Sequence, residues 1–256
     1  MKLSAQVSGN GPPLIILHGL FGSARNWSAV ARQLHDTRRV HLLDARNHGA
    51  SPRHRSMTYD QMAGDLHEYI AANGLQGAIV LGHSIGGKTA MNLALQQPGM
   101  IGALIVADIA PVAYTPHHAA LIKALRGTDL SGLTRRAEAE QRLAEKVDDA
   151  PTRAFLTSDL ATVESGLAWP FNLDAIDAGL RDLSDFPDAH RGRYPGPALF
   201  LVGGKSQYVR PDHHEPIARL FPASRIITID GAGHWLHAEK RDVFVDNVRN
   251  FLKNAR

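Results

Sequence analysis

A serine flanked by glycines occupies the most reactive setting in this sequence. Residues 82–86 read GHSIG, which matches the pattern G-x-S-x-G, and they lie between an apolar run at 78–81 and a helix-like run. At a sharp strand-to-helix turn the serine is strained and its hydroxyl is exposed, and the glycines avoid clashes that a Cβ would cause. The pattern therefore predicts that Ser84 is a nucleophile. The alternative is a glycine-rich turn in which Ser84 only caps the helix.

A second glycine-rich segment, HGLFGS at residues 18–23, directly follows another apolar run. In this kind of hydrolytic site, the loop after that strand supplies one backbone N–H to the oxyanion hole. Leu20 and Phe21 are the candidate donors, and we favour Phe21. The second predicted donor is the N–H of Ile85, at the positive amino end of the helix that follows Ser84. An ordinary glycine turn is the alternative for the loop.

One of the 14 histidines stands where a general base is needed. His234 lies in the segment GAGHW, between the last apolar run and the last helix-like run. Catalytic groups of open α/β sheets collect beyond the carboxyl ends of the strands. In hydrolases with a G-x-S-x-G turn on such a sheet, the nucleophilic serine comes first along the chain, then the acid, then the histidine. Both arguments favour His234 as the base. His18 precedes Ser84 in the chain, so we expect it to brace its loop.

The remaining histidines do not have the spacing of metal ligands. The sequence contains no HExxH or related pattern, so we predict no metal site. Five histidines that compete with His234 are expected to be solvated: His117, His118, His213, His214 and His237.

Three positions compete for the acid that orients the base. Ser206 follows the apolar run at 198–202, but a neutral hydroxyl does not stabilise an imidazolium by charge. Asp212 precedes a helix, where an aspartate more often caps free amides. Asp108 ends the run at 103–107, on the same predicted sheet edge as Ser84, although it also suits a turn before Pro111. We therefore favour Asp108.

Short apolar runs alternate with helix-like segments along most of the chain. Six runs have the composition of strands buried on both faces: residues 14–17, 40–43, 78–81, 103–107, 198–202 and 225–229. Five segments between them have helical patterns: residues 27–34, 58–73 with a capping box, 85–97, 212–220 and 242–253. This alternation predicts an α/β fold, in which a mostly parallel central sheet has helices on both faces.

About ninety residues between Asp108 and the run at 198–202 interrupt this alternation, which is too long for a structureless loop. Helical patterns occur at 118–125, 134–147 and 173–183. We therefore predict a core of residues 1–112 and 192–256, with a helical lid inserted at 113–191.

Composition excludes several other classes of protein. The chain has 256 residues, of which 44% are hydrophobic and 21% charged, as in ordinary globular domains. It contains no cysteine, which excludes disulfides and thiolate chemistry. The net charge of +3 is too small to indicate nucleic-acid binding. Neither a membrane span nor a secretory signal is evident, so we expect a cytoplasmic protein that is a monomer or small homo-oligomer.

Several motifs together resemble the small YbfF-type esterases of the alpha/beta-hydrolase superfamily, which are related to the abhydrolase-domain-containing proteins. They are HGLFGS, DARNHGASPR, GHSIGGK, ADIAPVAY, WPFNLDA and GAGHWLHAEKRD, and they span nearly the whole chain. The resemblance implies the alpha/beta-hydrolase fold and a serine esterase or thioesterase without a cofactor. Its expected substrates are small to medium acyl esters, or acyl-CoA. It also supports Asp108 as the acid, since Ser206 stands where the wider superfamily usually has aspartate.

The expected core and the expected lid both supply candidates for an apolar substrate pocket. They are Leu20, Ser206, Trp169, Phe171 and Trp235, together with Leu121 and Leu125; the alternative is that the lid residues form the core of the lid itself. Lys88, four residues after the nucleophile, is expected to form a structural salt bridge.

Two other functions are compatible with such a scaffold. One is cofactor-free chemistry other than hydrolysis, such as perhydrolysis or a lyase reaction. The other is a non-catalytic ligand-binding module, because a fold alone does not establish a function.

Overall fold

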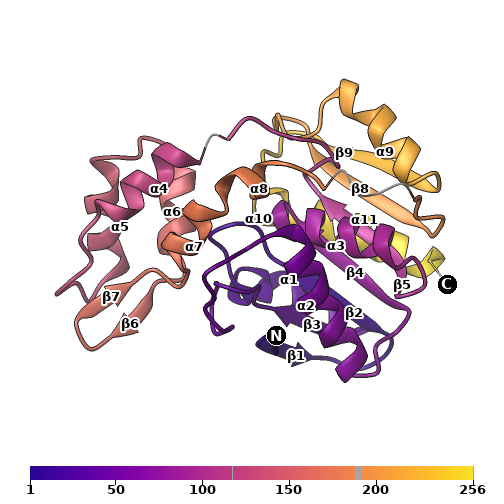
Figure 1. Cartoon of the computed structure of the whole chain (residues 1–256), viewed down its shortest axis with the longest axis horizontal. Helices are drawn as coiled ribbons and strands as arrows, with labels where there is room; N and C mark the ends of the chain where they lie inside the picture. Colours follow the sequence, from indigo (N-terminus) through magenta and orange to yellow (C-terminus); the bar gives the residue numbers. More distant parts are fainter. Residues whose placement is uncertain (117, 188–191, 256) are drawn as a thin grey trace.

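A seven-stranded sheet forms the centre of the computed structural model, which describes residues 1–116, 118–187 and 192–255. The strand order is β1-β3-β2-β4-β5-β8-β9 (Figure 1). The bounds are β1 Ala5–Ser8, β2 Pro13–Leu17, β3 Arg39–Leu43, β4 Ala78–His83, β5 Ile101–Ala107, β8 Ala198–Gly203 and β9 Ser224–Ile229. Only the pairing of β1 with β3 is antiparallel. The predicted α/β fold with a mostly parallel sheet is therefore confirmed.

The central strands are apolar because helices cover both of their faces. Every residue of β4 and β8 is buried. The edge strand β9 differs, since most of its residues are exposed or half-buried, and the expectation that it is buried on both faces is wrong. The other edge strand, β1, is fully exposed and carries no apolar run, and the sequence did not predict it.

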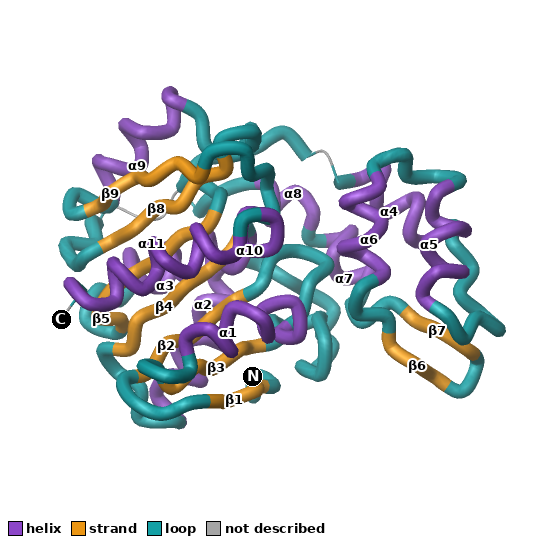
Figure 2. Tube along the Cα trace, turned by 180° about the vertical axis from the view of Figure 1, so that it is seen from behind, coloured by secondary structure: helices purple, strands orange, loops and turns teal. Residues whose placement is uncertain are grey.

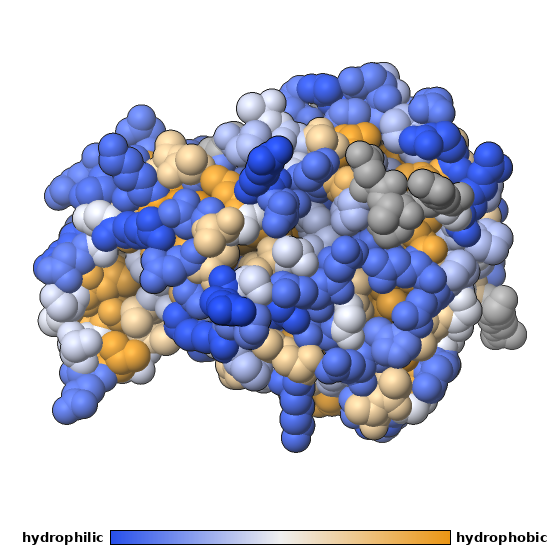
Figure 3. Space-filling view, viewed as in Figure 1, coloured by the Kyte–Doolittle hydropathy of each residue, from blue (hydrophilic) through white to orange (hydrophobic). Residues whose placement is uncertain are grey.

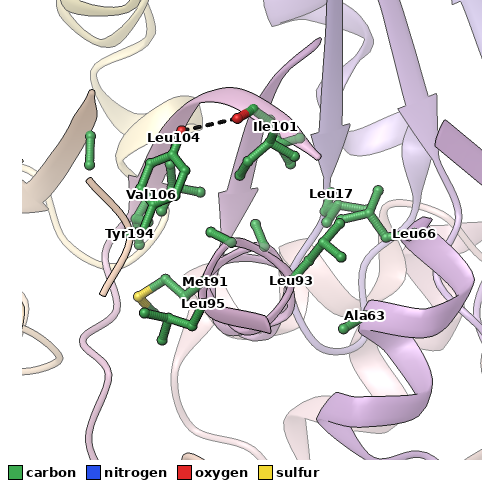
Figure 4. Close-up of a cluster of buried hydrophobic side chains, with 14 of the residues drawn as sticks. Leu17, Ala63, Leu66, Met91, Leu93, Leu95, Ile101, Leu104, Val106 and Tyr194 are labelled. Carbon is green, nitrogen blue, oxygen red and sulfur yellow. Dashed lines mark hydrogen bonds between the residues drawn. The ribbon is translucent and has the colours of Figure 1, made fainter. Parts of the chain in front are cut away.

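Two helical layers enclose the sheet (Figures 1 and 2). One face packs against α2 (Tyr59–Ala72), α3 (Ile85–Gln96) and α9 (His214–Leu220). The other packs against α1 (Ser28–Leu34), α10 (Leu236–Glu239) and α11 (Arg241–Asn254). Figure 4 shows the first core, where Met91 and Leu95 of α3 face Val106 of β5, and the hydroxyl of Tyr194 donates to the carbonyl of Ile101 at 3.3 Å.

The predicted helices of the core form with small shifts at their ends. The capping box of α2 is present, because Thr58 and Gln61 exchange side-chain-to-backbone hydrogen bonds. Short 3₁₀ turns at Ala24–Trp27 and Pro211–His213 precede α1 and α9. The short helix α10 was not predicted. In the described residues, no helix is long and apolar enough to cross a membrane.

The chain between β5 and β8, hereafter the insertion, has its own structure at one side of the sheet (Figure 1). It contains α4 (Ala119–Arg126), α5 (Arg136–Ala144), α6 (Ala150–Thr157), α7 (Leu173–Ala178) and α8 (Leu180–Ser184). A hairpin of β6 (Ala161–Val163) and β7 (Gly166–Ala168) joins α6 to α7.

The insertion differs from the expected helices in three ways. The helix α6 was not predicted. Gly179 separates α7 from α8, where the sequence predicted one continuous helical pattern. The hairpin was not predicted either, and its Val163 is 43% exposed. Figure 3 shows apolar side chains gathered at the end of the molecule where Figure 1 places the hairpin.

Candidate active site

Ser84 occupies the sharp turn between β4 and α3. Its backbone has φ 53° and ψ −121°, and its N–H donates to the carbonyl of Ala107 at 3.0 Å. A Cβ on Gly82 would lie 2.2 Å from the carbonyl oxygen of Gly86, and one on Gly86 would lie 2.5 Å from that of His18. These two positions therefore require glycine. The geometry agrees with the turn that the sequence predicted.

Asp108 lies directly after β5 with a fully buried side chain and a positive φ of 52°. Its Oδ2 accepts a hydrogen bond from Nδ1 of His234 at 2.7 Å, and its Oδ1 accepts from the N–H of Gly203 at 2.9 Å. The hydroxyl of Ser206 also donates to Oδ2. Three donors thus fix the carboxylate, and they hold it against the His234 ring.

The two other acid candidates lie elsewhere. Ser206 contacts Asp108 and does not reach the His234 ring by any hydrogen bond in the described structure. Asp212 is 63% exposed and pairs with Arg210 at 2.9 Å. The expectation that Asp212 caps a helix is wrong: it lies within the turn Pro211–His213, α9 has no side-chain cap, and the carboxylate accepts from the guanidinium of Arg210.

His234 and Ser84 line one cavity of about 230 Å³. Because Nδ1 of His234 is bound to Asp108, Nε2 is the nitrogen available for proton transfer. In the described residues no hydrogen bond joins His234 to the Ser84 hydroxyl. Such bonds are often long without substrate and shorten when it binds.

The cavity is lined by both the core and the insertion. Its walls are Leu20, Phe21, His83, Ser84, His118, Leu121, Thr152, Phe155, Leu156, Tyr208, His234 and Trp235. No Lys, Arg, Asp or Glu is among these described residues, so the cavity is suited to neutral, mainly apolar groups. Two larger hollows, of about 440 and 390 Å³, lie beside the end of α11 and contain neither Ser84 nor His234.

Some predicted pocket residues lie in the cavity wall and others do not. Leu20, Leu121 and Trp235 line it. Trp169, Phe171 and Leu125 are not in its wall; they belong to an apolar cluster shared by the insertion and the core, where Trp169 stacks on Phe171 and donates from Nε1 to the carbonyl of Leu125 at 3.1 Å. Ser206 is bound to Asp108 and is not in the wall.

No sequence pattern indicated several of the wall residues. Thr152, Phe155 and Leu156 belong to α6, which was not predicted, and Tyr208 lies in the loop after β8. Only the folded arrangement of the insertion over the sheet edge brings them together.

The turn Gly19–Gly22 carries both candidate oxyanion donors on the core side. The N–H of Gly22 donates to the carbonyl of Gly19 at 3.1 Å, and Phe21 has φ 62°, as at the third position of a type II turn. The N–H of Phe21 donates to Nε2 of His48 at 3.3 Å. Ile85 is the first residue of α3, so its N–H has no partner within the helix.

Buried histidines support the loops around the site. Nε2 of His18 accepts from the N–H of Ala45 at 3.0 Å, so His18 braces its loop as expected. Burial lowers the pKa of His48 to about 3, which keeps Nε2 an acceptor for the Phe21 N–H. Burial likewise lowers the pKa of His83 well below its usual value.

The expected solvation of the competing histidines is only partly correct. His214 is exposed. His213 and His237 are buried; Nδ1 of His213 donates to the carbonyl of Tyr208 at 3.1 Å, and the ring of His237 stacks on that of Trp27 with the centres 4.1 Å apart. His118 is half-buried in the cavity wall, and His117 lies outside the described residues.

Lys88 is almost completely buried on α3, and the expectation of a salt bridge is wrong. Its Nζ donates to the carbonyls of Asp185 at 2.7 Å and Ser184 at 3.4 Å, and it lies 4.6 Å from the centre of the Tyr114 ring. Burial lowers the pKa of this ammonium to about 7. Among the described residues, no group of three or more His, Cys, Asp or Glu side chains could hold a metal ion.

This fold and site define a hydrolase scaffold, and the chain belongs to the alpha/beta hydrolase fold family, whose profile matches residues 12–241. It is 41% identical to the sn-1-specific diacylglycerol lipase ABHD11 of Xenopus tropicalis, over 97% of this chain and 80% of the relative. It is 32% identical to esterase YbfF of Escherichia coli K12, over 98% and 97% of the two chains. A marine microorganism esterase has the same fold with a TM-score of 0.93 and 38% identity, over 98% and 99% of the chains. The resemblance inferred from the motifs is therefore confirmed.

Proposed function

We propose that this protein is a serine esterase that cleaves neutral carboxylic esters through an acyl-enzyme. The observation that carries the proposal is the 2.7 Å bond between Asp108 and His234, beside the cavity that contains Ser84. The names of the relatives, an esterase and a diacylglycerol lipase, support ester hydrolysis.

In the proposed mechanism, His234 removes the proton of the Ser84 hydroxyl while Oγ attacks the ester carbonyl carbon. Asp108 orients the imidazole and stabilises the imidazolium that forms. His234 then gives its proton to the leaving alcohol as the carbon–oxygen bond breaks, which leaves an ester on Ser84. Water attacks this ester, again with His234 as the base, and releases the acid and the free Ser84.

Two backbone donors stabilise the oxyanion in this mechanism. Ile85 supplies one of them, as the sequence predicts. For the other, the hydrogen bond from Phe21 to His48 argues against Phe21 and favours Leu20, the second candidate donor. A donor that is already engaged is less available to the negative charge that develops in the transition state.

The cavity supports a neutral acyl ester over an acyl-CoA thioester. Its described wall residues offer apolar side chains, imidazoles and hydroxyls, with no Lys or Arg to bind phosphate groups. The insertion supplies His118, Leu121 and the α6 residues to these walls, so we propose that it acts as a lid over the substrate, as the sequence predicts for 113–191.

The proposal is tested with a series of p-nitrophenyl esters from acetyl to decanoyl, alongside the CoA thioesters of the same acids. We expect kcat/KM to rise several-fold per two carbons until the cavity is full, because one buried methylene contributes about 0.8 kcal/mol. We expect the thioesters to react more slowly. Ser84→Ala should lower kcat by several orders of magnitude and abolish fluorophosphonate labelling. Labelling that persists in Ser84→Ala, or ligand binding without turnover in the wild type, would contradict the proposal.

A further inference from the structure

The aromatic ring of Tyr208 lies flat against the ring of His234. The ring centres are 4.0 Å apart and the planes differ by 25°. Tyr208 comes from the loop after β8, whereas His234 follows β9, so two separate segments meet in this stack. The mechanism proposed above does not use Tyr208.

A stacked neighbour restrains the plane of the His234 ring, which the hydrogen bond to Asp108 does not. A hydrogen bond at Nδ1 fixes one atom of the imidazole, but the torsion that rotates a histidine ring is broad. Proton transfer requires Nε2 to point at the Ser84 hydroxyl, so the plane of the ring matters as well as its tautomer. An aromatic face parallel to the imidazole restricts that plane, and it also favours the cationic form of the ring.

The backbone of Tyr208 is itself held at both ends. Its carbonyl accepts from the hydroxyl of Tyr114 at 2.6 Å and from Nδ1 of His213 at 3.1 Å. Its N–H donates to Oγ of Ser206 at 3.2 Å, and Ser206 in turn donates to Asp108. Tyr208 is therefore tied to the same acid that binds His234.

Tyr114 completes this support from the start of the insertion. Its hydroxyl accepts from the N–H of Ala110 at 2.9 Å while it donates to the Tyr208 carbonyl. Burial raises the pKa of Tyr114 and raises that of Tyr208 to about 12, so both phenols stay neutral. The ring of Tyr114 packs 5.6 Å from that of Tyr208.

We propose that Tyr208 is a positioning residue that fixes the plane of the His234 ring, and that Tyr114 holds Tyr208 in place. This inference rests on the proposed esterase function, because it concerns the same base. A simpler role for Tyr208 is that of a cavity wall that touches the substrate. The two roles differ in what the loss of the ring changes: kcat in the first and KM in the second.

The test compares Tyr208→Leu and Tyr208→Phe with a matched control, Phe155→Leu. Phe155 lines the same cavity and packs against Trp235 at 5.2 Å, so this control removes a wall ring that has no stacking contact with the base. Two rates are measured for each protein: hydrolysis of p-nitrophenyl acetate, and inactivation by diisopropyl fluorophosphate, which needs the base but little of the cavity.

We expect Tyr208→Leu to lose about tenfold or more in kcat and in the inactivation rate, because small displacements of catalytic groups are costly. KM should change by less than about threefold, and Tyr208→Phe should stay close to wild type. Phe155→Leu should alter KM while it leaves inactivation unchanged. Tyr114→Phe should show a smaller loss, and it should add nothing in the Tyr208→Leu background if it acts only through Tyr208.

Each contrary result has one meaning. If Tyr208→Leu is inactivated at the wild-type rate, or if Tyr208→Phe loses as much as Tyr208→Leu, then Tyr208 does not position the ring by stacking. If Tyr208→Leu fails to fold, Tyr114→Phe is the variant that tests the proposal. Inactivation of Tyr114→Phe by diisopropyl fluorophosphate at the wild-type rate would then overturn it. A wild-type protein that neither hydrolyses the ester nor reacts with the fluorophosphonate refutes the esterase function itself.

Discussion

At the scale of single residues, the acid is the sharpest assignment to test. Asp108→Asn keeps the shape of the side chain but removes the charge, and it disturbs the hydrogen bond that sets the tautomer of His234. We expect kcat to fall by as much as about 10⁴-fold with the fold preserved, as for the equivalent change in another serine hydrolase. Asp212→Asn is the matched control, because this exposed side chain pairs only with its neighbours in the described structure. A severe loss in Asp212→Asn, with Asp108→Asn near wild type, would reverse the assignment.

The choice between the Leu20 and Phe21 amides can also be tested by substitution. Leu20 occupies the second position of the Gly19–Gly22 turn, where proline is accommodated in type II turns. Leu20→Pro therefore removes the N–H with little change to the turn. If this N–H binds the oxyanion, kcat should fall by about 10²- to 10³-fold relative to Leu20→Ala, which removes only the side chain. Equal rates in the two variants would return the role to Phe21.

The sequence predicts those residues of the candidate site that are marked by their immediate neighbours in the chain. Ser84 is marked by its glycines, and His234 and Asp108 by the strands that precede them. The partner of the Phe21 N–H is His48, which is 27 residues away, and the ring against His234 comes from Tyr208. These contacts depend on how distant loops meet at the sheet edge, which no local pattern encodes.

At the scale of elements, the turn around Ser84 requires glycine at position 86, in the first turn of α3. Gly86→Ala would bring a Cβ to 2.5 Å from the carbonyl oxygen of His18 and 2.7 Å from that of Leu17. We expect a loss of at least about 1–3 kcal/mol in the free energy of unfolding, since overpacking forces the backbone apart, and a large loss of activity as Ser84 shifts.

A second helical glycine serves as the control. Gly64 lies on the exposed side of α2, and nothing stands within 4 Å of the position of its Cβ. Gly64→Ala should therefore stabilise the protein by about 0.5–1 kcal/mol through helix propensity, with activity unchanged. Urea unfolding of the two variants measures both effects. If Gly86→Ala were as stable as Gly64→Ala, the close approach of α3 to the loop at His18 would be wrong.

The elements that the sequence misses have weak patterns for physical reasons. β1 (AQVS) is an exposed edge strand, so it has no apolar run to detect. The hairpin β6–β7 has strands of three residues, too short for a period to appear. Gly179 interrupts α7 and α8, yet the apolar spacing continues across it because both helices face the same cluster. The buried central strands, by contrast, are predicted because burial on both faces leaves only apolar residues.

At the scale of the whole molecule, buried neutral histidines tie stability to pH. Burial lowers the pKa of His48 and of His237 to about 3, whereas the pKa of a histidine in an unfolded chain is about 6.5. Between these values the unfolded chain binds protons that the folded chain does not. The stability that these groups contribute is therefore complete above about pH 6.5, and it is lost as the pH falls toward 3.

Each of the two histidines should lower the free energy of unfolding by up to about 1.4 kcal/mol per pH unit below about pH 6.5. At pH 5.5 their combined effect is therefore a sizeable part of the free energy of unfolding of a typical protein, which is about 5–15 kcal/mol. His237→Phe tests this, because phenylalanine keeps the stack on Trp27 and removes a buried Nδ1 that has no partner in the described structure. The free energy of unfolding, measured in urea at pH 7.5, 6.5 and 5.5, should fall less steeply in this variant than in the wild type. His214→Ala, at an exposed position, should keep the wild-type slope. If His237→Phe also keeps that slope, protonation of His237 is not what destabilises the fold in acid.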